Sequence, residues 1–143
     1  MKRLLCSILC IAAACVGPAR TDRAYEAKAV ETAKAVASAV ETARLAARAA
    51  GEGKATGQYL SVLLGETENE AGAASGAFDS ILPPSGQAEA LHDRLAELIA
   101  TVVDVLRDLR IAARRSQIDS LPGIARGLEG PADALHRFVE SRE

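Results

Sequence analysis

Residues 86–117, GQAEALHDRLAELIATVVDVLRDLRIAARRSQ, decide the fold of this 143-residue chain. Apolar side chains recur through this stretch at alternating spacings of three and four residues, which is the pattern of one face of an α-helix. They are Ala88, Leu91, Leu95, Leu98, Val102, Val105, Leu109 and Ala112, with Ile99 and Leu106 widening the stripe. Pro83 and Pro84 disfavour a helix immediately before the stretch, and Ser85 is suited to cap its first turn. The pattern predicts a long amphipathic helix over residues 86–117.

Two helices are predicted on the N-terminal side of this stretch. Residues 22–50 contain no glycine or proline and carry a narrow face of small side chains, formed by Val30, Ala33, Ala37, Val40 and Ala47. Residues 54–82 carry a second apolar face, formed by Leu60, Leu64, Thr67, Ala71, Ala74, Phe78 and Ile81. This second helix also contains glycines, each costing about 1 kcal/mol relative to alanine. They are Gly57, Gly65, Gly72 and Gly76. A compensating interpretation is that they face the alanines of the first helix and let the two backbones approach closely.

A fourth helix is predicted over residues 121–142. Ser120 and Pro122 are typical of a turn followed by a helix start. An apolar pattern follows at Leu121, Ala125, Leu128, Ala132, Leu135 and Val139. Gly130 and Pro131 predict a kink at 130–131. Four helices joined by short turns predict an all-α, up-down-up-down antiparallel four-helix bundle over residues 22–143.

The N-terminal residues are predicted to be a targeting signal that is removed from the mature protein. Met1, Lys2 and Arg3 form a short cationic start, and residues 4–14 are apolar or small except for Ser7. A basic start, an apolar stretch of this length and small residues at its end indicate a cleaved secretory signal peptide over residues 1–14.

The end of that stretch reads Ala12-Ala13-Ala14-Cys15. It resembles the lipobox of bacterial lipoproteins, in which leucine, then alanine or serine, then glycine or alanine precede the cysteine that is lipidated. Ala13, Ala14 and Cys15 match this pattern, whereas Ala12 departs from the preferred leucine. The resemblance implies that Cys15 is lipidated, that residues 15–21 are a lipidated cysteine and short tether, and that the protein is anchored in the cell envelope on the extracytoplasmic side of a bacterial membrane. Ala12 and Ala14 also suit ordinary signal peptidase, which would release a soluble domain.

The cysteine positions, the net charge and the absence of catalytic motifs limit which functions the chain can have. No cysteine follows Cys15, so the bundle is expected to lack disulfides, thiolate metal sites and cysteine nucleophiles. The net charge of -2 does not favour a nucleic-acid partner. No Gly-x-Ser-x-Gly or His-Glu-x-x-His motif is present. We therefore expect a non-enzymatic helical binding or scaffolding module without a cofactor, attached to the membrane through its lipid, with a protein or cell-wall component as a further partner.

The sequence around the two histidines suggests an alternative function. Each follows a carboxylate by three residues, Glu89 before His92 and Asp133 before His136, so each pair lies on one side of its helix. This spacing is similar to the Glu-x-x-His ligands of di-iron bundle proteins. Because the third and fourth helices are expected to be antiparallel, both histidines should lie at the same end of the bundle. The alternative is a small metal- or haem-binding protein using these four residues, with iron or haem as its cofactor; surface histidines without a ligand explain the same pattern.

A basic cluster near the end of residues 86–117 is the last candidate site. It consists of Arg107, Arg110, Arg114 and Arg115. Such a cluster predicts recognition of an anionic partner, for example a polyanionic cell-wall component. Arginines near a helix C-terminus also interact favourably with its partial negative charge, which is the competing interpretation.

Overall fold

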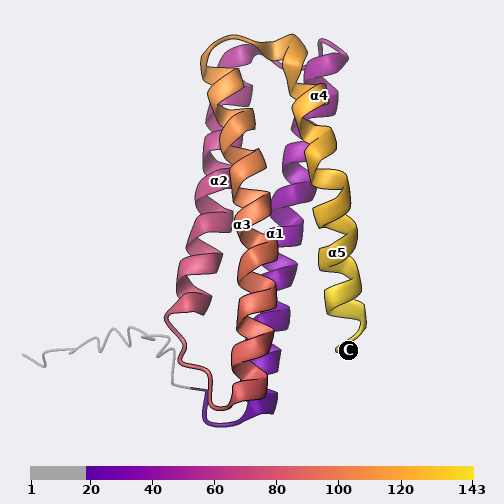
Figure 1. Ribbon diagram of the computed structural model, residues 1–143. Helices are drawn as coiled ribbons and strands as arrows, with labels where there is room; N and C mark the ends of the chain where they lie inside the picture. Colours follow the sequence, from indigo (N-terminus) through magenta and orange to yellow (C-terminus); the bar gives the residue numbers. More distant parts are fainter. Residues whose placement is uncertain (1–18) are drawn as a thin grey trace, which may run out of the picture.

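The computed structural model describes residues 19–143, so the predicted signal peptide and Cys15 lie outside the described residues. The chain forms α1 (Asp22–Gly51), α2 (Gly57–Asp79), α3 (Gly86–Arg114), the 3-10 turn η1 (Ile118–Ser120), α4 (Leu121–Ala125), the 3-10 turn η2 (Arg126–Leu128) and α5 (Glu129–Glu140). The segments α4, η2 and α5 form a single rod, so four rods run up, down, up and down (Figure 1). The predicted all-α antiparallel four-helix bundle is confirmed.

Side-chain hydroxyls define the starts of the three long helices. Thr21, Thr56 and Ser85 stand at the N-cap positions of α1, α2 and α3 in extended backbone conformations. Each hydroxyl oxygen accepts a hydrogen bond from the backbone N–H three residues on, over 3.2, 3.3 and 3.1 Å respectively. These bonds satisfy donors that have no partner inside the helix. The Ser85 hydroxyl also donates to Oδ1 of Asp22 over 2.6 Å, which links the starts of α1 and α3.

Two helices end where a residue adopts a left-handed backbone conformation. Gly53 has φ +66° after α1, and Ser116 has φ +59° after α3. After α3, the N–H of Ser116 donates to the carbonyl of Ala113 and that of Gln117 to the carbonyl of Ala112. This pair of bonds is a Schellman motif, which closes the last helical turn. Helix α3 therefore ends at Arg114, three residues before the predicted end at 117.

The second and fourth predicted helices are shorter or more divided than expected. Helix α2 spans Gly57–Asp79 rather than 54–82, because Thr56 caps its start and the residues before Pro83 turn away from helical geometry. In the fourth rod, the interruption lies at Arg126–Leu128 rather than at 130–131. Pro131 sits within the first turn of α5, where its ring would clash with the carbonyl of residue 127 in a continuous α-helix. The chain avoids that clash with the η2 turn.

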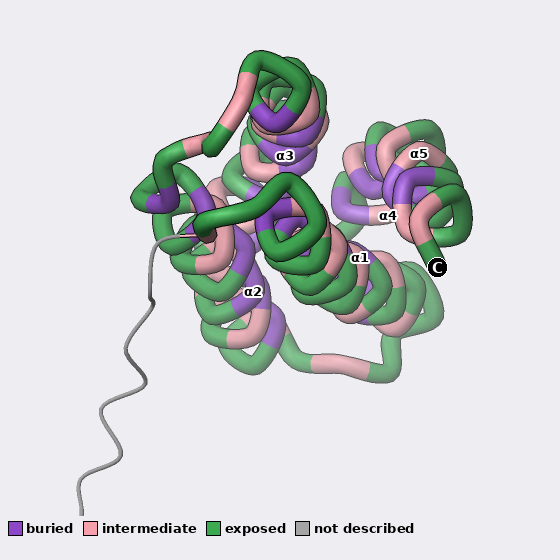
Figure 2. Tube along the Cα trace, turned by 90° about the horizontal axis from the view of Figure 1, so that it is seen from below, coloured by how far each residue is buried: buried purple, intermediate pink, exposed green. Residues whose placement is uncertain are grey.

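The core follows the predicted stripes closely in α2 and less closely in α3. In α2, Leu60, Leu64, Thr67, Ala71 and Phe78 are all buried. In α3, the buried residues are Ala88, Leu95, Ile99, Val102, Leu106, Leu109, Ala112 and Ala113. The core side of α1 is mainly alanine, and small side chains permit close packing of the neighbouring helices (Figure 2). No helix described between residues 19 and 143 is long and apolar enough to span a membrane.

Three residues that the heptad places in the core of α3 are only half-buried: Leu91, Leu98 and Val105. All three lie toward the fourth rod. Leu91 and Leu98 line cavities that also contact Arg142, and a Cβ added at Gly127 would lie 3.3 Å from Val105. The fourth rod therefore covers α3 less completely than α1 and α2 do.

The glycines of α2 do not face the alanines of α1, so that interpretation is wrong. A Cβ added at Gly72 or Gly76 would meet no atom within 4 Å, and one added at Gly65 would meet Arg110 of α3 at 3.7 Å. The close approach to α1 occurs instead at its end. There, a Cβ added at Gly51 would lie 2.9 Å from Cγ of Pro122 in α4.

Candidate functional site

An aromatic and histidine cluster lies at the end of the bundle where α1 begins. Tyr25 comes from α1, Phe78 from α2 and His92 from α3. The ring centroids of Tyr25 and Phe78 are 5.2 Å apart with planes tilted by 43°, and those of Phe78 and His92 are 5.4 Å apart with planes at 21°. Tyr25 and Phe78 are buried, and His92 is half-buried. The imidazole thus closes this end of the core against α2.

The His92 imidazole also contacts two carboxylates. Its Nε2 lies 3.2 Å from Oδ1 of Asp79, the last residue of α2, and its Nδ1 lies 3.5 Å from Oδ1 of Asp93. The contact with Asp79 joins the end of α2 to the start of α3. His92 therefore acts as a link between helices.

The Tyr25 hydroxyl is the one buried side-chain oxygen or nitrogen in residues 19–143 that has no hydrogen-bond partner. Burial raises the pKa of Tyr25 above its ordinary value of 10.0, and the charges of Asp79 and Asp93 raise this pKa further. The side chain is therefore neutral at physiological pH, and its hydroxyl has no protein partner in the described chain.

His136 lies in a different part of the bundle. It lines a cavity of about 460 Å³ with Lys34, Ala37, Ser38 and Glu41 of α1 and Val139 of α5. Lys34 is nine residues beyond Tyr25, which corresponds to roughly 13 Å along α1. His136 therefore faces the middle of α1, whereas His92 faces the end of α2.

The four residues of the predicted metal or haem site are not brought together. Glu89, Asp133 and His136 are exposed, and residues 19–143 contain no group of three or more His, Cys, Asp or Glu side chains that could hold a metal ion. The expectation that both histidines share one end is not met, because His136 lies beside the middle of α1. Nothing in this arrangement favours the metal- or haem-binding alternative.

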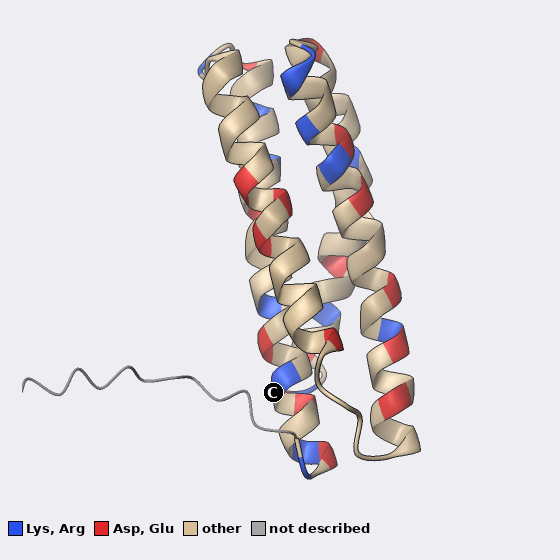
Figure 3. Cartoon of the chain, turned by 90° about the vertical axis from the view of Figure 1, so that its left-hand side faces the viewer, with Lys and Arg blue, Asp and Glu red and all other residues tan. Residues whose placement is uncertain are grey.

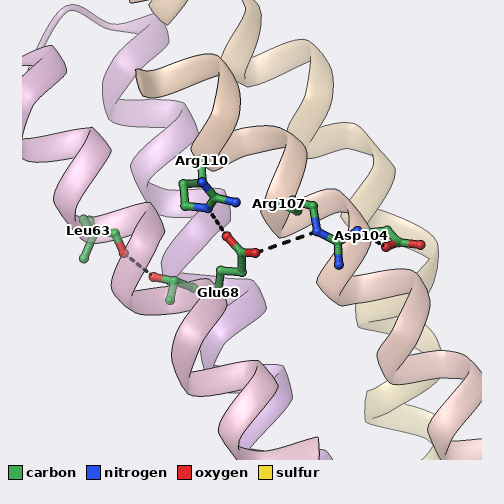
Figure 4. Close-up of polar contacts among 6 residues, drawn as sticks. Leu63, Glu68, Asp104, Arg107 and Arg110 are labelled. Carbon is green, nitrogen blue, oxygen red and sulfur yellow. Dashed lines mark hydrogen bonds and ion pairs between the residues drawn. The ribbon is translucent and has the colours of Figure 1, made fainter. Parts of the chain in front are cut away.

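The predicted basic cluster is divided by an ion pair between α2 and α3. Nε of Arg110 pairs with Oε2 of Glu68, whose side chain is 16% exposed, and Nε of Arg107 lies 3.9 Å from Oε1 of the same carboxylate (Figure 4). Arg107 also bonds Asp104 over 2.7 Å. Arg114 and Arg115 remain exposed at the end of α3. Two of the four arginines thus join helices. Along the rods, basic and acidic side chains are interspersed (Figure 3).

A surface groove lies between α3 and α5. Its volume is about 620 Å³. We call it the α3–α5 groove. It is lined by Arg94, Glu97, Leu98 and Thr101 of α3 and by Ala134, Arg137, Phe138, Ser141 and Arg142 from α5 and the residues after it. Its place is explained by the incomplete cover that the fourth rod gives to Leu98.

One wall of the α3–α5 groove is held by the Arg142 side chain. Its guanidinium carbon lies 4.0 Å from the Phe138 ring centroid. Its Nη1 donates to the Phe138 carbonyl over 3.1 Å and to the Ser141 hydroxyl over 2.8 Å. Its Nε also lies 3.4 Å from Oε1 of Glu26 in α1. These contacts order the end of the chain against α1.

The α3–α5 groove was not predicted from the sequence. The heptad assigned Leu91 and Leu98 to a closed core, and no local pattern reports how far a neighbouring helix extends. Pro131 predicts a break in the fourth helix, but it does not predict which part of α3 is left uncovered. Comparison of the chain with protein-family models, with curated proteins and with solved structures gave no match.

Proposed function

We propose that this chain is an envelope lipoprotein, anchored through Cys15 on the extracytoplasmic side of a bacterial membrane, whose helical bundle acts as a binding module. The anchor is proposed from the lipobox resemblance of residues 12–15. The binding role is supported by the α3–α5 groove, a half-apolar depression with its own ordered arginine wall.

The position of the groove fits this arrangement. Residue 19 enters the bundle at the end where α1 starts (Figure 1). A second cavity at that end, of about 260 Å³, contains Asp22 and Glu26 of α1 and shares Arg94 and Arg142 with the α3–α5 groove. The six residues between Cys15 and α1 would span at most about 20 Å when extended. A lipid on Cys15 would therefore keep this end of the bundle close to the membrane. The groove would then face the region close to the lipid surface.

The anchor is tested by Cys15→Ser in the full-length chain. We expect the wild type in the membrane fraction with the added mass of a lipid on Cys15, and the variant in the soluble fraction without that mass. Cys10→Ser is the matched control, since it changes a cysteine of the same N-terminal stretch outside the lipobox, and it should behave as the wild type. Wild-type protein without lipid mass, with unchanged membrane partitioning of Cys15→Ser, would refute the anchor.

A further inference from the structure

Two arginines on the rim of the α3–α5 groove have no ionic partner. Arg94 of α3 and Arg137 of α5 are exposed and form no ion pair with any residue in 19–143, whereas Arg142 is paired with Glu26. Glu97 also lines the groove and is likewise without an ion-pair partner in that part of the chain. Two free guanidinium groups against one free carboxylate leave this rim with one net positive charge. The groove is therefore suited to a ligand with a single negative charge.

The floor of the groove is apolar. Phe138 is 6% exposed, and Leu98 and Ala134 are half-buried lining residues. The volume of about 620 Å³ falls within the range of roughly 300 to 1,000 Å³ typical of small-molecule sites. The apolar surface continues past Arg94 toward Leu91, in the adjoining cavity. An apolar floor under a positively charged rim fits a ligand with an apolar chain and an anionic head.

We propose that the α3–α5 groove binds a long-chain fatty-acid anion. The carboxylate lies between Arg94 and Arg137, because a guanidinium group donates two parallel hydrogen bonds to a carboxylate. The acyl chain covers the half-buried side chains of Leu98 and Ala134, which removes apolar surface from water. This inference rests on the binding role proposed above and names the chemical class of its ligand.

The test is photo-crosslinking of the full-length protein in membranes with a diazirine-bearing fatty acid, followed by peptide mapping. We expect the adducts in the peptides that contain residues 94–101 and 134–142. The double variant Arg94→Ala, Arg137→Ala should lower labelling about tenfold or more, because it removes both charge-assisted contacts. Glu97→Gln should increase labelling, since it removes the carboxylate from the rim. A fatty alcohol with the same chain and diazirine should label the groove weakly.

The matched control is the double variant Arg114→Ala, Arg115→Ala. It removes the same charge from exposed arginines at the opposite end of α3 and should leave labelling unchanged. Circular dichroism checks that each variant keeps its helicity. Labelling outside the groove, equal labelling by the fatty alcohol, or undiminished labelling of Arg94→Ala, Arg137→Ala would each overturn the proposal. A cross-link between two copies of the chain at this groove would also overturn it, in favour of self-association.

The same measurement on Cys15→Ser separates this inference from the proposed anchor. Saturable groove labelling of Cys15→Ser, whether soluble or membrane-bound, supports the fatty-acid site independently of the lipidation. If Cys15→Ser is found in the soluble fraction but its groove is still labelled, the fatty-acid site is supported without the anchor. A lipidated, membrane-bound wild type that is not labelled rejects the site and leaves the anchor intact.

Discussion

At the scale of the residue, Tyr25 combines complete burial with an unsatisfied hydroxyl. Its ring packs on Phe78 and fills the end of the core, whereas its oxygen has no partner in the described chain. Because an uncompensated buried hydroxyl is costly, we expect Tyr25→Phe to increase the free energy of unfolding by about 1 kcal/mol. Urea unfolding at neutral pH measures this change. A variant that is less stable than the wild type would show that the hydroxyl has a partner after all.

The raised pKa of Tyr25 makes a separate prediction for alkaline pH. A folded-state pKa above the ordinary 10.0 means that the folded protein binds this proton more tightly than the unfolded chain. The resulting stability is complete below about pH 10 and is lost as pH rises through the folded-state pKa. Between about pH 9 and pH 11, wild type should therefore lose more stability than Tyr25→Phe. Tyr59→Phe is the control, because Tyr59 is 59% exposed and should retain the wild-type pH dependence.

The ion pair between Glu68 and Arg110 is the residue-scale link between α2 and α3. Their side chains are 16% and 24% exposed, so solvent screens the pair only partly. A double-mutant cycle with Glu68→Ala and Arg110→Ala should give a coupling of about 1 kcal/mol, with each single variant destabilised. The exposed pair Lys28 and Glu31 is the comparison, and its coupling should stay below about 0.5 kcal/mol. Equal couplings for the two pairs would mean that burial adds nothing to this contact.

At the scale of the element, local chemistry predicted the helices better than their ends. Ser85 and the apolar stripe placed α3 correctly at its start, because both the cap and the periodicity are short-range properties. Its end was missed, since Ser116 supplies a left-handed conformation that is uncommon for serine and carries no sequence signal. Leu98 shows the corresponding limit for burial. The apolar stripe contains both Leu98 and Ile99, but Leu98 lies toward the fourth rod, which covers it only in part, so Ile99 is the buried one of the two.

The exposed glycines make α2 the element that is easiest to stabilise. Gly72 has helical neighbours on both sides and open space where a Cβ would stand. Gly72→Ala should raise the free energy of unfolding by about 0.5 to 1 kcal/mol, because alanine loses less backbone freedom on folding. Gly51→Ala is the contrasting variant. Its Cβ would lie 2.9 Å from Pro122, so we expect a lower melting temperature for it. Thermal unfolding measures both changes, and a Gly72→Ala variant that melts below the wild type would contradict the expectation for α2.

At the scale of the whole molecule, the four rods are not equivalent. Helix α1 is packed by α2, α3 and the fourth rod (Figure 2), whereas α5 packs mainly on α1 and leaves the α3–α5 groove beside α3. This asymmetry explains why the candidate site was not predicted. Residues Arg94 and Arg137 are far apart in sequence and become neighbours of one groove only through the antiparallel packing of α3 and α5.

The same asymmetry predicts the order of local opening. Helix α5 has only 12 residues, lacks a side-chain cap at its start, and borders the groove along α3. Segments with few buried contacts open locally at a free energy lower than that of global unfolding. We therefore expect amide hydrogens of α5 to exchange at least about tenfold faster than those around Val36 and Val40 in the buried part of α1.

A variant that fills the α3–α5 groove tests whether the open groove causes the faster amide exchange expected in α5. Ala134→Leu adds apolar surface beside Leu98 and Phe138, so it should slow exchange in α5 while leaving the amides of α2 unchanged. Leu45→Ala, which alters an exposed side chain of α1, is the control and should change neither helix. If α5 is protected as strongly as α1 in the wild type, the fourth rod is held as firmly as the others. The α3–α5 groove would then be a rigid recess rather than the least stable part of the bundle.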